Sequence, residues 1–228
     1  MFWQEPPEAS LTSRPHQVEL LFQLTGKTLP VDHAYALGQA LQAALPWLNT
    51  EPQVSVHDIH VAASGNGWWR PEAPDALLHL SKRTKLTLRL PRSRCADAQA
   101  LCGQQLEISG HPLYVGAASE RELTPSTTLF ARYLLAHPDE TEQAFLTRYA
   151  AELTRHGLTV RKLLCGMGHA LRLGNTEQAT RSLLIAELKP DESLHLQQQV
   201  IGGGNQYGCG LFIPHKGIAP VKHESDDH

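Results

Sequence analysis

The sequence has few cysteines, little net charge and no long apolar segment. Its four cysteines form no CxxC pair, which argues against a zinc ribbon and is typical of free thiols in a reducing cytoplasm. No apolar run approaches the about 20 residues of a membrane-spanning helix, and no basic start followed by an apolar stretch indicates a secretory signal. We therefore expect a cytoplasmic protein with no membrane partner. The net charge of −3 requires that any surface for nucleic acid be local.

Several motifs of catalytic sites are also missing. No GK[ST] sequence is present, so a nucleotide cofactor is not expected, and no Gly-x-Ser-x-Gly is present to anchor a hydrolase triad. The thirteen histidines include no HxH, HxxxH or HExxH pair. The nearest spacing, between His57 and His60, is not a standard set of metal ligands. The sequence therefore predicts neither a cofactor nor a metal ion.

The hydrophobic pattern predicts an α+β protein. At 228 residues, 41% of them hydrophobic, the chain suits two domains of about a hundred residues each. Strand-like and helix-like patterns alternate as two βαββαβ units, here proposed as residues 1–120 and 121–228, with a charged tail expected to be disordered. In the first unit we expect strands at 17–24, 54–63, 84–90 and 105–115 and helices at 32–48, with Asp32 as N-cap, and 95–101. In the second we expect strands at 128–135, 158–164, 169–173, 181–188 and 209–214, with a hairpin about Gly166 and Gly168, and helices at 139–156 and 191–199.

A basic stretch, residues 81–94, contains no acidic residue. In a strand, Lys85, Thr87 and Arg89 would share one face, opposite the intervening leucines. Residues two apart are separated by about 6.6 Å, close to the step between phosphates of a single strand. The alternative is a solvated sheet face; in either case we expect folding to survive replacement of Lys85 and Arg89. The six candidate residues for binding nucleic acid are Lys82, Arg83, Lys85, Arg89, Arg92 and Arg94.

A glycine-rich segment, residues 202–210, separates an expected helix from an expected strand. That order is the reverse of the one in dinucleotide-binding and P-loop motifs. Its glycines could bring backbone amides close to a phosphodiester backbone, although a flexible connection would have the same composition. The candidate RNA-binding glycines are Gly202, Gly203, Gly204, Gly208 and Gly210.

His33 is the candidate catalytic residue. It follows Asp32 at an expected helix N-terminus, where outward-pointing amides favour a phosphate and disfavour imidazolium, so that a neutral imidazole could accept a proton. Tyr35 lies close by in the sequence. The alternative is an ordinary surface histidine, in which case His60 or His215 would be the next candidate.

Three segments together resemble a known family. They are LPVDHAYAL at 29–37, LSKRTKLTLRLP at 80–91 and YGCGLFIPHK at 207–216, the last within a GxGxxxGxG pattern. The glycine pattern resembles the signature of the repeat-associated (RAMP) superfamily. The three segments in order resemble the sixth family of CRISPR-associated proteins, in its myxobacterial-type subtype, over roughly residues 17 to 217.

This resemblance implies two tandem ferredoxin-like domains and an endoribonuclease that cuts CRISPR repeat RNA without a metal ion. It implies binding of a crRNA hairpin and of other effector-complex subunits. His33 would be catalytic with Tyr35 as a weaker assignment, and Lys216 would join the RNA-binding residues. Related glycine loops usually carry Lys or Arg between the glycines, whereas this one has Asn205 and Gln206.

The chemistry needs only an acid, a base and cations. The 2′-hydroxyl beside the scissile phosphate attacks phosphorus, which leaves a 2′,3′-cyclic phosphate, and positioned acid–base groups contribute about 10²–10⁴-fold each. Two other functions remain open: a subunit that binds the hairpin without cutting it, and an unrelated enzyme that binds a phosphorylated metabolite on the basic strand.

Overall fold

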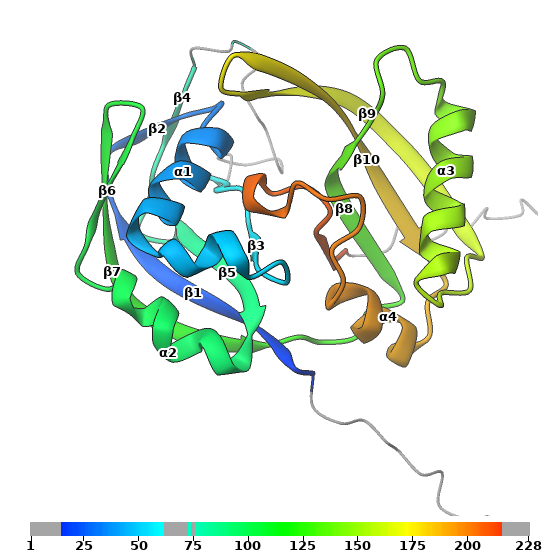
Figure 1. Ribbon diagram of the computed structural model, residues 1–228, viewed down its shortest axis with the longest axis horizontal. Coiled ribbons are helices and arrows are strands. Elements are labelled where there is room, and N and C mark those ends of the chain that lie inside the picture. The colour runs from blue at the N-terminus through cyan, green and yellow to red at the C-terminus, as the bar shows by residue number, and fades with distance from the viewer. Residues whose placement is uncertain (1–14, 62–72, 74–75, 216–228) are drawn as a thin grey trace, which may run out of the picture.

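The structure is a computed structural model that describes residues 15–61, 73 and 76–215. Two antiparallel sheets follow one another along the chain (Figure 1). The first half contains β1 (Gln17–Thr25), β2 (Thr28–Pro30), α1 (Ala34–Ala44), η1 (Pro46–Thr50), β3 (Ser55–Val56), β4 (Leu77–His79), β5 (Lys85–Pro91), η2 (Arg92–Arg94), α2 (Cys95–Ala98), η3 (Gln99–Leu101), β6 (Gln105–Ile108) and β7 (His111–Glu122). The second half contains β8 (Thr128–Leu135), α3 (Glu142–Arg155), β9 (Lys162–Leu173), β10 (Thr176–Ala186), α4 (Pro190–Gln197), η4 (Asn205–Tyr207) and β11 (Phe212–Pro214).

The sheet of the first half has the strand order β3-β5-β1-β7-β6, and β2 and β4 form a separate pair. Alternate residues of its central strands, such as Leu20 and Phe22 of β1 and Leu88 of β5, are fully buried. They pack with Leu37 and Leu41 of α1 in one core, because the period of two in a strand directs alternate side chains to the same face. Helices α1 and α2 cover this face of the sheet (Figure 1).

The sheet of the second half has the order β11-β8-β10-β9 and a core of its own. Thr141 caps α3, since its hydroxyl accepts a hydrogen bond from the amide of Ala144 at 3.2 Å. The buried side chains of α3 are Phe145, Tyr149 and Leu153, four residues apart and therefore on one helix face against the sheet. No helix in the described part of either half is long and apolar enough to cross a membrane.

The predicted order of elements is confirmed in outline, and the strand predicted at 128–135 has these bounds. The predicted hairpin about Gly166 and Gly168 is wrong, because β9 runs through both glycines and turns only after Leu173. Gly166 marks a close approach between strands instead: a Cβ there would lie 2.2 Å from the hydroxyl oxygen of Ser182, beside a register shift in β10.

Three other boundaries differ from the prediction. Within the described residues, the strand expected at 54–63 is limited to Ser55–Val56. The strand expected at 105–115 is divided into β6 and β7 by a turn in which Ser109 and Gly110 take positive φ. His33 rather than Asp32 occupies the N-cap of α1. The charged tail lies outside the described residues.

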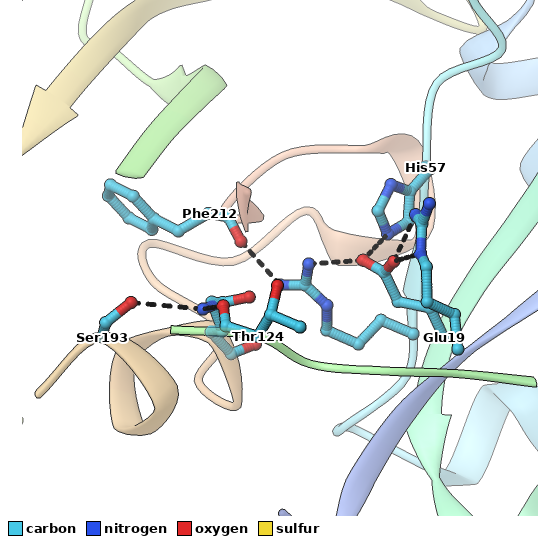
Figure 2. Close-up of polar contacts among 8 residues, drawn as sticks. Glu19, His57, Thr124, Ser193 and Phe212 are labelled. Carbon is cyan, nitrogen blue, oxygen red and sulfur yellow. Dashed lines mark hydrogen bonds and ion pairs between the residues drawn. The ribbon is translucent and has the colours of Figure 1, made fainter. Parts of the chain in front are cut away.

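A buried arginine connects the two halves (Figure 2). Arg89 of β5 is 1% exposed, and its Nη2 donates to Glu19 Oε1 of β1 at 2.6 Å. Its Nη1 donates to the carbonyl oxygens of Gln197 and Phe212, at 2.8 and 2.7 Å, in the second half. The expected alternation of β5 is therefore confirmed, but the face that carries Arg89 is covered by protein. The prediction that Arg89 contacts RNA is wrong, because its guanidinium is enclosed and engaged.

Further polar side chains complete this network. Glu19 Oε2 also accepts a hydrogen bond from Arg121 Nε of β7 at 2.9 Å, and His57 Nε2 lies 3.3 Å from Glu19 Oε1. Burial alone would raise the pKa of Glu19, but His57 and Arg89 bring that pKa well below its ordinary value. The side-chain amide of Gln197 donates to the carbonyl of Thr124, between the two sheets, so the connecting segment is held as well (Figure 2).

We predict that Arg89→Ala destabilises the protein strongly. The variant removes one of the two arginines that pair with buried Glu19 and leaves two carbonyl oxygens without their donor. Breaking a buried ion pair typically lowers the free energy of unfolding by about 3–5 kcal/mol. Denaturant unfolding, followed by circular dichroism, measures this change. Arg92→Ala is the matched control: its side chain is 37% exposed and pairs with Glu122 at 2.7 Å, and exposed pairs contribute at most about 1 kcal/mol. Equal stabilities of the two variants would contradict the prediction.

Candidate active site

His33 is fully buried at the N-cap of α1. Its Nδ1 lies 2.8 Å from the carbonyl oxygen of Pro30, which can only accept, so Nδ1 carries a proton. Its Nε2 accepts a hydrogen bond from the amide of Ile59 at 3.1 Å. Both ring nitrogens are therefore used to hold the chain before α1 and the chain after β3. In this conformation the ring has no surface that RNA could contact.

Asp58 lies between His33 and two further polar side chains. Its carboxylate is 5% exposed, and Oδ1 lies 2.7 Å from Nε2 of His33. Oδ2 lies 3.6 Å from Nδ1 of His60 and accepts a hydrogen bond from the hydroxyl of Tyr133 at 3.4 Å. The His60 side chain is 26% exposed and thus the accessible imidazole on this carboxylate. Tyr133 comes from β8, so the cluster joins both halves of the molecule.

His169 of β9 lies on the other side of Tyr133. The two rings meet edge to face, with centroids 6.0 Å apart. His169 is exposed, whereas Tyr133 is 2% exposed. Asp58, Tyr133 and His169 are not among the site residues that the sequence predicts. No motif marks them, because the contact between β8 and the segment after β3 is long-range. Among the described residues, no three His, Cys, Asp or Glu side chains are arranged to hold a metal ion.

Tyr35 lies in the first turn of α1, between the glycine-rich segment and the turn that joins β9 to β10. Its ring is 5.7 Å from that of Tyr207, and a Cβ on Gly174 would lie 3.4 Å from its hydroxyl. Gly174 is in the turn between β9 and β10, where Arg172 Nε also lies 3.9 Å from Asp32 Oδ2. The tip of this hairpin therefore covers the beginning of α1 and leaves Tyr35 half-buried.

The glycine loop (residues 202–210) contacts the first half directly. Gln206 and Tyr207 lie so close to α1 that a Cβ on Gly38 would be 2.9 Å from the Gln206 carbonyl oxygen. The Asn205 side chain donates to the carbonyl oxygens of Pro52 and Val54. Figure 1 shows this loop against α1 and β3. Its role in the structure is therefore to join the halves.

The glycines serve this packing. All five predicted glycines have φ between 72° and 82°, a region that side chains with a Cβ rarely adopt. The amides of Gly202, Gly208 and Gly210 donate to Glu152, Asn205 and Tyr133, respectively. The prediction that these three amides face RNA is wrong, because they are already bonded within the protein. Gly203 and Gly204 are half-buried.

The predicted basic residues separate into two groups. At the C-terminal end of β5, Arg92 pairs with Glu122 at 2.7 Å and Arg94 with Asp97 at 2.9 Å. At the other end, Lys82 and Arg83 are exposed and Lys85 is half-buried, and none of the three pairs with an acidic residue of the described chain. The exposed Lys27 lies nearby, since its carbonyl accepts the amide of Leu80. We call Lys27, Lys82, Arg83 and Lys85 the basic cluster. Lys216 lies outside the described residues.

A family model described as Cas6 Crispr matches residues 18–217. The chain belongs to the Cas6 family. The resemblance inferred from the three sequence segments is thus confirmed. A CRISPR-associated endonuclease Cas6 of Myxococcus xanthus (strain DK1622) is 32% identical over 197 residues, which cover 86% of this chain and 81% of that protein.

Solved structures agree with this Cas6 assignment at the level of fold. A Cas6-related protein from Pyrococcus furiosus superposes with a TM-score of 0.56 at 10% identity, over 86% of this chain and 98% of that one. A structure described as a RAMP protein binding different RNA substrates has a TM-score of 0.56 at 11% identity, over the same shares of the two chains.

Proposed function

We propose that this Cas6-family chain is an endoribonuclease that cuts CRISPR repeat RNA and remains bound to the crRNA hairpin in an effector complex. The proposal rests on family membership and on one observation, the Asp58 carboxylate held between His60 and Tyr133 where the two halves meet. We also propose that the halves are tandem ferredoxin-like domains, residues 1–120 and 121–228. In both sheets the strand after the first helix is at one edge, next to the strand that precedes the second helix.

In this proposal His60 is the general base and His33 is a positioning residue. His60 presents part of its ring to solvent, and the carboxylate of Asp58 stabilises the imidazolium that forms when the ring takes the proton of a 2′-hydroxyl. His33 orders the Asp58 segment through the amide of Ile59. The reaction leaves a 2′,3′-cyclic phosphate and a 5′-hydroxyl, and no step requires a metal ion.

The basic cluster is the proposed surface for the RNA backbone. Its cations have no acidic partner within the described chain, so phosphate binding breaks no ion pair there. Arg92 and Arg94 are half-buried and would first have to leave Glu122 and Asp97. A local cluster of this kind permits RNA binding by a chain whose net charge is −3.

We predict that cleavage of a repeat hairpin continues in EDTA and stops when the sugar at the cut site is 2′-deoxy. The nucleophile is the 2′-hydroxyl, so a deoxy sugar removes it, whereas chelation removes nothing that the mechanism uses. Gel analysis of end-labelled RNA gives both results, and phosphatase sensitivity identifies the cyclic end. A requirement for Mg²⁺ would contradict the mechanism.

We predict that His60→Ala lowers the single-turnover cleavage rate by at least about a hundredfold, the low end for one acid–base group. Hairpin affinity and melting temperature should change little, because the ring is half-exposed. His33→Ala should instead lower the melting temperature, since it removes a buried ring with two hydrogen-bonded nitrogens.

The opposite result would assign the catalytic role to His33. In that case His33→Ala would lose cleavage at an unchanged melting temperature, and His60→Ala would be as active as the native protein. Tight hairpin binding without any cleavage by the native protein would indicate the non-cleaving crRNA-binding subunit.

We predict that replacing Lys82, Arg83 and Lys85 together with Ala weakens hairpin binding and flattens its salt dependence. Each phosphate contact contributes about 0.7–0.9 to the slope of log affinity against log salt, so three lost contacts should reduce the slope by about 2–2.7. Binding measured from low to physiological salt tests this. Lys189→Ala, an exposed lysine at the start of α4, is the control. An unchanged slope in the triple variant would place the RNA elsewhere.

A further inference from the structure

Repeat cleavage by this mechanism transfers two protons. One leaves the attacking 2′-hydroxyl, and the other must reach the departing 5′-oxygen. His60, beside Asp58, accounts for the first transfer only. A second proton carrier has to be accessible to RNA and has to lie near the same carboxylate.

His169 meets both requirements. It is exposed on β9 and its ring packs on Tyr133, whose hydroxyl donates to Asp58 at 3.4 Å. Asp58 in turn lies 3.6 Å from His60. His60, Asp58, Tyr133 and His169 therefore form a continuous series of contacts, with an accessible imidazole at each end and buried groups between them.

The backbone around His169 is fixed by the sheet. His169 pairs with Thr180 of β10, and the Thr180 hydroxyl donates to the His169 carbonyl at 3.0 Å. Thr180 is 1% exposed. Tyr133 is likewise fixed, because its carbonyl accepts the amide of Gly210 at 2.9 Å. A side chain on a rigid strand can be held in the geometry that proton transfer requires.

We infer that His169 is the general acid and that the catalytic site is assembled from both halves of the chain; the inference rests on the proposed function. His60 takes the proton of the 2′-hydroxyl as the 2′-oxygen bonds to phosphorus. The bond from phosphorus to the 5′-oxygen breaks, and His169 protonates that oxygen. Tyr133 positions both imidazoles, one through Asp58 and the other through the edge-to-face contact of the two rings.

His169→Ala should lower single-turnover cleavage of an ordinary repeat hairpin by at least about a hundredfold, with affinity within a few-fold and an unchanged melting temperature. His137→Ala, which removes an exposed histidine in the loop after β8, is the matched control and should cleave normally. Cleavage by His169→Ala at the native rate would overturn the inference.

A substrate with sulfur in place of the bridging 5′-oxygen separates acid from base. A thiol has a pKa near 8.5, so the thiolate leaves without a proton donor. On this substrate His169→Ala should recover to within a few-fold of the native rate, whereas His60→Ala should remain impaired. Equal impairment of His169→Ala on both substrates would overturn the acid role.

Tyr133→Phe keeps the ring beneath His169 but removes the hydroxyl from Asp58, so it should slow both substrates alike. If the native protein cuts neither substrate, the proposed function itself is wrong. If the native protein cuts and His169→Ala cuts at the same rate, only the role of His169 is wrong.

Discussion

The buried guanidinium of Arg89 binds Glu19 in its own sheet and two carbonyl oxygens of the other half. A charge in so dry an environment needs polar partners that offset its desolvation. Nη1 and Nη2 have such partners, whereas Nε has no hydrogen-bond partner among the described residues. The carbonyls of Gln197 and Phe212 belong to α4 and β11, the elements on either side of the glycine loop. Arg89 therefore holds both flanks of the glycine loop against the first sheet.

The position of the cluster formed by His33, Asp58, His60 and Tyr133 is related to that arrangement. The glycine loop packs on α1 and on residues 52–58. The segment after β3 therefore lies between this loop and the first sheet, close to β8. Asp58, in the segment after β3, contacts the hydroxyl of Tyr133 of β8, so residues from the two halves meet there. The glycine loop, which the sequence predicts to contact RNA, therefore joins the two halves of the molecule.

The basic residues in and beside β5 have different surroundings at its two ends. Residues at its C-terminal end are neutralised by Glu122 and Asp97 or enclosed with Glu19, whereas those at its N-terminal end face solvent without acidic partners in the described chain. The six basic residues of this stretch therefore fall into two groups. Those at the C-terminal end form ion pairs within the protein, and those at the N-terminal end form a cationic surface. A slightly acidic protein can in this way present a local attraction for phosphate.

Local patterns in the sequence predicted the order of elements, the alternation of β5 and the family, because periodicity and motifs extend over a few neighbouring residues. They could not show that the polar face of β5 is covered, that β9 continues through Gly166, or that His33 is enclosed. Nor did they indicate Asp58, Tyr133 and His169 as partners. All these features depend on how the two halves pack against each other. That packing is determined by contacts between residues that are distant in the sequence. A strand pattern is the same whether its polar face meets water or another domain; only the tertiary structure distinguishes the two.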